Sequence, residues 1–276
     1  MMRGMFSAIS GLKTHQVMLD VVANDIANVN TIGYKAARTT FKDSLAQLQL
    51  GAAAPSLGQG GQNAAQIGLG VQLGSIDNLM ATGALQNTGN VLDVSIQGKG
   101  MFTVGLGNPP AMPTNYQYTR AGNFTLNAQG NLVTQDGYFV VGRNTPTAGA
   151  PNTYLNVPPG SSDLAIAQDG SVSYVPPGGG ARTVAGYLSL TTFPNESGLQ
   201  RTAGNRWMES PSSGVPTQGT PGGNFGLAVS GTVEMSNVDI ATEFTSMIGA
   251  QRGFQANSRV ISTSDEMLQD LVNLKR

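Results

Sequence analysis

The chain contains no cysteine, and this absence removes several kinds of chemistry at once. Disulfide bridges, thiolate nucleophiles and cysteine-based metal sites are all excluded. Histidine occurs once, as His15, so a catalytic triad or a histidine-rich metal site would depend on that single side chain. Charged residues make up only 11% of the 276 residues, against roughly 25% in average globular proteins.

An excess of charge of one sign and long apolar runs are also missing. The formal net charge is −1, so no overall field attracts nucleic acid or anionic lipid. No stretch approaches the roughly 20 apolar residues of a membrane span. Lys13 and His15 interrupt the N-terminal segment, which therefore lacks the apolar core of a cleaved signal peptide. We expect no nucleic-acid binding and no membrane insertion, and any export must use a route that needs no cleaved signal.

What the sequence does have is a matching apolar pattern at its two ends. The residues on the N-terminal stripe are Met5, Ile9, Leu12, Leu19 and Ile26. The residues on the C-terminal stripe are Phe244, Met247, Phe254, Ile261, Leu268 and Leu271. A period near 3.5 places such residues on one seam of a helix that packs against another helix. We therefore predict that these side chains form contacts between subunits.

The middle of the chain has a different period. From about residue 67 to 235, short segments with alternating apolar side chains are separated by glycine-containing turns. Asp169-Gly170, between two such segments, is a strong hairpin signal. Frequent short strands of this kind indicate an antiparallel β domain. The sequence thus predicts an α+β fold, in which the N- and C-terminal helices pair as a coiled coil and a mainly antiparallel β domain is inserted between them.

The predicted domain boundaries follow these changes of period. Residues 1–40 and 236–276 should form a terminal helical core domain, and residues 76–235 a β-rich domain. Residues 41–75 should form a connector with a short helix and a Gly/Ala-rich stretch over 51–66.

The ends of the predicted helices follow from capping residues. The first helix should run over about 3–30 and stop in a run of asparagine and glycine. The last should begin after a cap at Asn237 or Asp239 and run to about residue 274. The short helix of the connector should contain Phe41, Leu45 and Leu48.

Each group with chemical potential has a simpler structural interpretation. His15 lies within the helical stripe, and Gly68-Leu69-Gly70 lacks both the spacing and the following helix of a nucleotide loop. Asp136 and Asp169 lie in Asp-Gly turns, where a carboxylate bonds its own backbone. A core or subunit contact is favoured for Trp207 over stacking on a sugar. We predict no catalytic, cofactor-binding or metal-binding residues, and no enzyme activity.

Both ends of the chain resemble the signatures of bacterial flagellar rod and hook proteins. Residues 20–35, which include Ala27-Asn28-Val29-Asn30-Thr31-Ile32-Gly33-Tyr34-Lys35, resemble the N-terminal signature. Residues 234–239 and 243–268 resemble the C-terminal one. Residues 92–102 and 118–124 resemble the opening of the family's β domain. Asp25 stands where the family usually has asparagine, and Tyr34 where phenylalanine is common.

The resemblance implies a structural subunit that assembles into a tube, with the paired helices inside and the β domain as an outer layer. The implied partners are many copies of the same chain, the adjoining rod and hook-filament junction proteins, the flagellar export apparatus and the hook cap. No cofactor is implied. The implied location is the bacterial flagellum, in the extracellular hook or the distal rod, after export without a cleaved signal peptide.

Within the family, the sequence is most similar to the short type of hook protein, because the run 265–276 is hook-like. This reading predicts the flexible joint between rod and filament. The alternative is the distal rod protein, a rigid drive shaft of similar size with a similar connector. An alternative of another class is a monomeric β-domain adhesin or binding module, which would not require apolar stripes at both ends.

Overall fold

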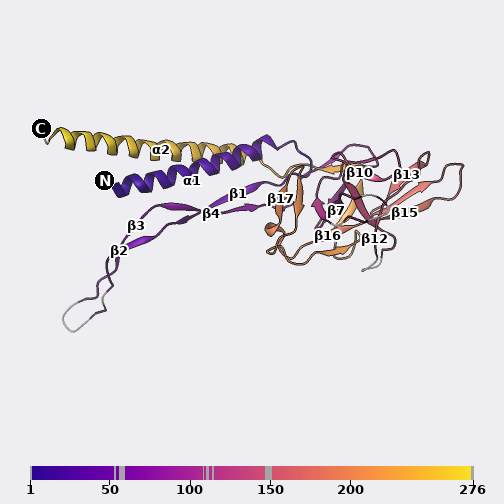
Figure 1. Ribbon diagram of the computed structural model, residues 1–276, viewed down its shortest axis with the longest axis horizontal. Coiled ribbons are helices and arrows are strands. Elements are labelled where there is room, and N and C mark those ends of the chain that lie inside the picture. The colour runs from indigo at the N-terminus through magenta and orange to yellow at the C-terminus, as the bar shows by residue number, and fades with distance from the viewer. Residues whose placement is uncertain are drawn as a thin grey trace. The chain divides into compact units, whose positions relative to one another are not determined.

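The computed structural model describes residues 2–52, 54–55, 60–107, 109, 112–113, 115–146 and 151–274. The chain forms two compact units. The helical unit comprises Met1–Ala27, Ala37–Asn78 and Asp239–Arg276. The β unit comprises Asn28–Ala36 and Leu79–Val238. Figure 1 labels the helices and strands of both units.

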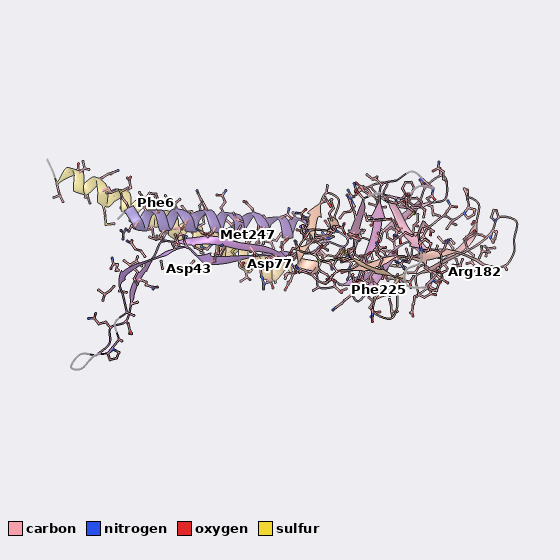
Figure 2. The ribbon with its side chains drawn as sticks, turned by 60° about the horizontal axis from the view of Figure 1, so that its bottom comes forward. Phe6, Asp43, Asp77, Arg182, Phe225 and Met247 are labelled. Carbon is pink, nitrogen blue, oxygen red and sulfur yellow. The ribbon has the colours of Figure 1, made fainter. Side chains whose placement is uncertain are left out.

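The helical unit contains both predicted long helices. Its elements are α1 (Met2–Ala27), β1 (Ala37–Asp43), β2 (Ala46–Leu50), β3 (Ala65–Gly68), β4 (Val71–Asn78) and α2 (Ile240–Asn273). The two helices lie side by side in both views of the ribbon (Figure 1 and Figure 2). β1 pairs with β4 and β2 pairs with β3, both antiparallel, so the chain between the helices begins as a two-stranded ribbon.

The ends of the helices have local causes. α1 ends three residues earlier than predicted, because the backbone turns after Ala27: Thr31 N–H donates to the carbonyl of Asn28 (3.1 Å). α2 begins at the predicted cap, since a carboxylate oxygen of Asp239 accepts from Ala241 N–H at 3.0 Å. This bond satisfies one of the free N–H groups of the first turn.

The short helix predicted around Phe41, Leu45 and Leu48 is wrong. β1 and β2 occupy this segment instead. Ala46-Gln47-Leu48-Gln49-Leu50 alternates apolar and polar residues, which favours a strand over a helix. Pairing with β3 supplies its hydrogen-bond partners. The Gly/Ala-rich stretch predicted at 51–66 includes residues 53 and 56–59, which lie outside the described residues.

The β unit is built of short strands, and the pairings among its described residues are antiparallel, as predicted. The strands are β5 (Leu85–Asn87), β6 (Val94–Gln97), β7 (Met101–Gly105), β8 (Tyr116–Thr119), β9 (Phe124–Leu126), β10 (Leu132–Thr134), β11 (Phe139–Arg143), β12 (Asn152–Tyr154), β13 (Ser162–Ile166), β14 (Ser171–Val175), β15 (Thr183–Leu188), β16 (Leu190–Thr192), β17 (Gln200–Thr202), β18 (Arg206–Met208), β19 (Thr217–Gly219), β20 (Leu227–Ser230) and β21 (Thr232–Glu234), with one 3₁₀ turn at Glu196–Gly198. The main sheet has the order β13-β14-β15-β11-β7-β8-β18-β17. Two smaller pairs, β20 with β6 and β21 with β5, join segments far apart in the chain.

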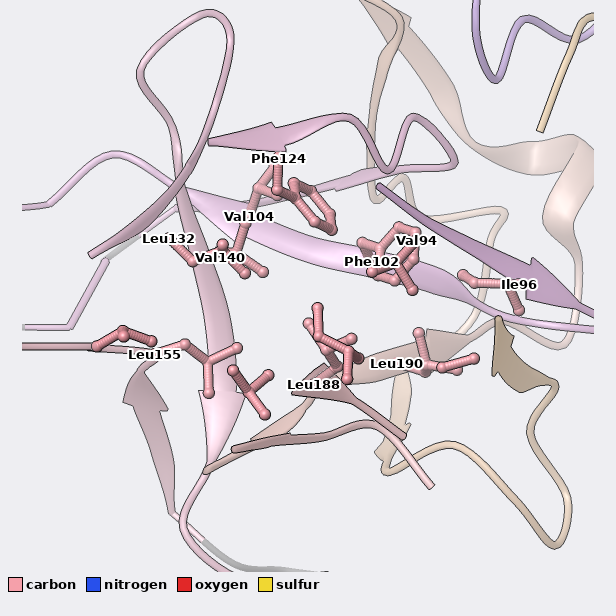
Figure 3. Packing of buried hydrophobic residues seen from close by; sticks show 14 residues of the cluster. Val94, Ile96, Phe102, Val104, Phe124, Leu132, Val140, Leu155, Leu188 and Leu190 are labelled. Carbon is pink, nitrogen blue, oxygen red and sulfur yellow. The ribbon is translucent and has the colours of Figure 1, made fainter. Parts of the chain in front are cut away.

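Two apolar clusters form the core of the β unit. Figure 3 shows the larger, in which aromatic and aliphatic side chains such as Phe102, Phe124 and Leu188 pack from several strands. The smaller contains Tyr118, Phe193 and Trp207. Trp207 is 0% exposed, so its indole cannot stack on a sugar, and the prediction of a core role is confirmed.

The predicted turns have two different outcomes. Asp169 lies in the β13–β14 hairpin, and its carboxylate accepts from the N–H (3.0 Å) and hydroxyl (2.7 Å) of Ser171, as predicted. Asp136 also lies in a turn, but its carboxylate binds the guanidinium of Arg206 rather than its own backbone. This ion pair joins the turn between β10 and β11 to strand β18 and gives Asp136 a structural role.

Candidate assembly surfaces on the terminal helices

α1 and α2 run antiparallel in a regular register. Burial raises the pKa of Glu243 near the start of α2, and the charges of Asp25 near the end of α1 and of Asp239 raise it further. His15, ten residues before Asp25 on α1, contacts Gly253, ten residues after Glu243 on α2. Each step along one helix is therefore matched by an equal step along the other.

The fully buried residues of the two helices are small or polar rather than large and apolar. They are Ala8, Gly11, Thr14, Val22, Asp25, Ala250 and Ser264. The hydroxyl of Thr14 donates to carbonyls one turn earlier, as does that of Ser264, so these polar groups are satisfied within their own helices. Small buried side chains allow the two helix backbones to approach closely.

The predicted stripe residues are only partly covered by the single chain. Those that are half-buried are Met5, Leu12, Leu19, Ile26, Met247, Ile261 and Leu268. Those that are exposed are Ile9, Phe244 and Phe254, the last two at 49% and 38%. The side chain of Leu271 lies outside the described residues. Contacts between subunits are not observed in a single chain, so the interface role of these residues stays a prediction.

Further large apolar side chains are exposed on the helices. Met2 and Phe6 on α1 are both 61% exposed, and Ile240 and Ile248 on α2 flank Phe244 at intervals of four residues. Residues four apart share one face of a helix. The sequence prediction named Phe244 on this face but not Ile240 or Ile248, which lie four residues to either side of it.

The ribbon of the helical unit also carries uncovered apolar side chains. Leu45, Leu48 and Leu50 on or beside β2 are exposed, as is Ile67 on β3. A two-stranded ribbon is only marginally stable by itself in water. Large apolar patches on a monomer mark places where another molecule binds. The helical unit thus offers two kinds of surface that association would cover.

The β unit contains a buried ionic cluster that sequence patterns did not reveal. The Nζ of Lys35 lies 2.5 Å from Oε1 of Glu234 and donates to the carbonyl of Ala81 at 2.7 Å. Arg120 donates to the other carboxylate oxygen at 3.1 Å and to the carbonyl of Gly98 at 2.7 Å. Burial lowers the pKa of Lys35, and the attraction of Glu234 opposes this effect. Buried charges persist only when paired and hydrogen-bonded in this way.

Several interactions besides this ionic cluster attach the segment Asn28–Ala36 to the rest of the β unit. Gly33 N–H donates to the carbonyl of Glu234 (2.7 Å), and its φ of +68° and contact with the backbone of Ala121 leave no room for a Cβ. The guanidinium of Arg201 lies over the rings of Tyr34 (4.3 Å) and Trp207 (5.1 Å) and donates to the carbonyl of Lys35 (2.6 Å). The sequence grouped this segment with the terminal helices, whereas its bonds attach it to the β unit.

The described part of the chain offers neither a metal site nor a membrane span. It contains no group of three or more His, Asp or Glu side chains that could hold a metal ion. No helix among these residues is long and apolar enough to cross a membrane.

Three family models match successive parts of the chain. Residues 5–35 match "Flagella basal body rod protein", residues 95–174 match "Flagellar hook protein FlgE/F/G D1 domain", and residues 229–274 match "Flagellar basal body rod FlgEFG protein C-terminal". The matched regions contain nearly all of α1, much of the β unit and all of α2.

Full-length relatives give the same result. The chain is 46% identical to the flagellar basal-body rod protein FlgG of Bacillus subtilis, over 100% of both chains. It is 39% identical to FlgG of Agrobacterium fabrum, over 96% of this chain and 97% of the relative. It is 27% identical to the flagellar hook protein FlgE of Borreliella burgdorferi, over 100% of both chains in an alignment of 447 positions.

An antiparallel β unit between two terminal helices, together with these matches, defines a structural component of the bacterial flagellar axis rather than an enzyme. More particularly, the chain belongs to the family of flagellar rod and hook proteins, FlgE/F/G.

Proposed function

We propose that this chain is a rod protein of the flagellar basal body, one that polymerises into the distal part of the rod. The observation that carries the proposal is its end-to-end similarity to proteins named as FlgG rod proteins, at 46% and 39% identity. The chain and these relatives align almost throughout, so the likeness includes the β unit and the ribbon as well as the helical ends.

The hook reading has weaker support. The hook protein of Borreliella burgdorferi is 27% identical and aligns over 447 positions, whereas this chain has 276 residues. The hook protein therefore carries segments that this chain lacks. The prediction of a hook protein from the sequence rested on residues 265–276, which are only a small part of the chain. A connector similar to that at 45–70 is compatible with either protein.

The proposed mechanism is assembly through the terminal helices. Apolar faces that contain Phe6, Phe244 and Ile248 are exposed in the single chain, and neighbouring copies would cover them. Burial of one large apolar side chain contributes about 1.5–3 kcal/mol, so several per subunit offset the cost of association, which is about 4–15 kcal/mol. Contacts that join one surface of a copy to a different surface of the next generate a helical polymer when the rotation between copies does not close a ring.

In this proposal the helices pair as a coiled coil along the inner wall of the tube, and the β units form the outer layer. The polymer's other partners are the adjoining rod and hook proteins and the flagellar export apparatus. The location is the flagellar basal body.

Deletion of the gene in its own bacterium tests the proposal. Electron cryotomography of the mutant should show basal bodies with a shortened rod and no hook, while hook protein is still synthesised. A complete rod that lacks only the external hook would assign this chain to the hook instead. Restoring the gene on a plasmid should restore the rod, which excludes effects on neighbouring genes.

A further inference from the structure

The glycines of the two terminal helices fall into two classes. Glycine inside a helix costs about 1 kcal/mol relative to alanine, so each needs a structural reason. A Cβ added at Gly4 or Gly249 would meet nothing within 4 Å. A Cβ at Gly11 would lie 2.7 Å from Nδ2 of Asn257, and one at Gly253 would lie 2.6 Å from Cε1 and Nε2 of His15. Only Gly11 and Gly253 leave space that a side chain of the other helix fills.

The two contacts are reciprocal. Each helix provides one glycine and one large polar side chain: α1 provides Gly11 and His15, and α2 provides Gly253 and Asn257. On each helix the two residues are four apart, so they lie on the same face in consecutive turns. The side chain of His15 on α1 packs against Gly253 of α2, and the side chain of Asn257 on α2 packs against Gly11 of α1.

A slip of one helical turn, about 5–6 Å, would lose this fit in either direction. In one direction the two large side chains, His15 and Asn257, would face each other. In the other direction the two glycines, Gly11 and Gly253, would face each other and leave a void. Apolar heptads alone do not discriminate between such registers, because every turn of the stripe presents a similar surface.

Further contacts attach the ribbon to α1 beside these residues. The imidazole of His15 packs edge-to-face with Phe41 of β1, with ring centroids 5.8 Å apart. Ser10 Oγ accepts from the N–H of Val71 at 3.2 Å. A single side chain, His15, thus contacts both α2 and the ribbon.

We propose that His15 on Gly253 and Asn257 on Gly11 act as positioning residues that set the register between α1 and α2. The register decides how far α2 extends beyond α1 and which apolar side chains, such as Phe244 and Ile248, stay uncovered for neighbouring copies. The inference deepens the proposed function, and its consequence for the polymer rests on that function.

Alanine substitutions at the four glycines test the proposal. On helix propensity alone every Gly→Ala change should stabilise the helices. We expect Gly11→Ala and Gly253→Ala instead to raise the protein concentration needed for polymerisation by about tenfold, because the added methyl overpacks the contact. Gly4→Ala and Gly249→Ala, the matched controls, should assemble at the wild-type concentration or below it. Polymer is measured by sedimentation and negative-stain electron microscopy.

Double variants separate the proposed contact from general damage to the helices. His15→Ala should restore assembly to Gly253→Ala, and Asn257→Ala should restore it to Gly11→Ala, because each removes the side chain that the methyl meets. Exchanged pairs, such as Gly253→Ala with Asn257→Ala, should show no such rescue. Assembly of Gly11→Ala and Gly253→Ala at the concentrations of the controls, or no rescue by the matching substitution, would overturn the proposal.

Disulfide cross-linking measures the register between α1 and α2 directly. Because the native chain contains no cysteine, only the introduced cysteines can form a disulfide. Positions 18 and 250 face each other in the observed register, three residues from His15 and Gly253. The full chain carrying Met18→Cys and Ala250→Cys should therefore form an intrachain disulfide, whereas Met18→Cys with Ser246→Cys should not. Cross-linking of 18 to 246 instead would overturn the register. A wild-type chain that forms no polymer, while 18 and 250 still cross-link, would contradict the proposed function and support the register.

Discussion

Lys35 and Glu234 are 199 positions apart in the sequence, and their side chains form an ion pair in which both are 0% exposed. Lys35 lies in the segment that follows α1, and Glu234 ends the strand β21 that precedes α2. The pair therefore joins the two stretches of chain that lead into the terminal helices. Arg120 binds the second oxygen of the same carboxylate, so two buried cations share one buried anion.

Replacing Lys35 by methionine should destabilise the β unit. The substitution removes the ammonium that donates to Glu234 and to the carbonyl of Ala81. Because Arg120 still pairs with the carboxylate, the expected loss is that of hydrogen bonds to a charged group, about 1.5–3 kcal/mol. Guanidinium unfolding, followed by the fluorescence of Trp207, measures the change.

The matched control is Arg182→Met, which breaks an exposed ion pair with Asp163. Exposed pairs contribute at most about 1 kcal/mol. Equal losses from Lys35→Met and Arg182→Met would show that the buried cluster does not stabilise the β unit.

Truncation should locate the N-terminal boundary of the β unit at Asn28. Chains that begin at Asn28 keep the bonds from Gly33 to Glu234 and from Lys35 to Glu234, and should retain the melting temperature of the β unit. Chains that begin at Ala37 lose these bonds and should be less stable by at least the cost of the Lys35 hydrogen bonds, about 1.5–3 kcal/mol. Differential scanning calorimetry compares the two. The same melting temperature for both chains would contradict the assignment of Asn28–Ala36 to the β unit.

The ends of the chain were the most predictable from sequence, and long-range polar contacts the least. The apolar heptads predicted both helices because a helix repeats its pattern locally. Leu45 and Leu48 misled the prediction because a spacing of three fits a helix, although the glutamines between the apolar residues also fit a strand. No local sequence pattern pairs Lys35 with Glu234. Helix propensity shows only that Gly11 and Gly253 destabilise their helices. The partners that explain these residues lie more than 190 positions away in the sequence.

Protonation of Glu243 should favour the paired helices. Burial first, and then the charges of Asp25 and Asp239, raise the pKa of Glu243 above the ordinary 4.5. A raised folded-state pKa means that the stabilising contribution is full below pH 4.5 and is lost as the pH rises through the raised value. Glu243→Gln stays neutral throughout, so it should polymerise at lower concentration than the wild type near pH 7. Sedimentation between about pH 4.5 and pH 7 measures the concentration at which each variant polymerises.

Glu266→Gln is the control for Glu243→Gln, because it makes the same change of charge at an exposed position of α2. It should keep the wild-type dependence of polymerisation on pH. The same shift in both variants would mean that net charge, rather than the environment of Glu243, controls assembly.

Phe254→Asp should prevent polymerisation without unfolding the β unit. Phe254 is 38% exposed in the single chain, and a neighbouring copy would bury the remainder. The substitution removes roughly 1 kcal/mol of apolar burial between copies, because only the exposed part of the side chain is still to be buried. It also introduces a charge that must lose its water, and the loss repeats in every subunit. Sedimentation measures polymer, and calorimetry checks the β unit.

Gln255→Asp, one residue away and about 100° around the helix, controls for charge on α2. It should assemble near the wild-type concentration. Polymerisation of Phe254→Asp at that concentration, or equal damage from both substitutions, would show that this stripe does not hold copies together.

Electron cryomicroscopy of the polymer formed by the purified chain would show whether the paired terminal helices build the tube. We expect a straight tube in which α1 and α2 line the inner wall, with His15 of α1 against Gly253 of α2, and in which the β units form the outer layer. A chain that stays monomeric at high concentration, or a polymer joined only through its β units with the helices unpaired, would contradict it.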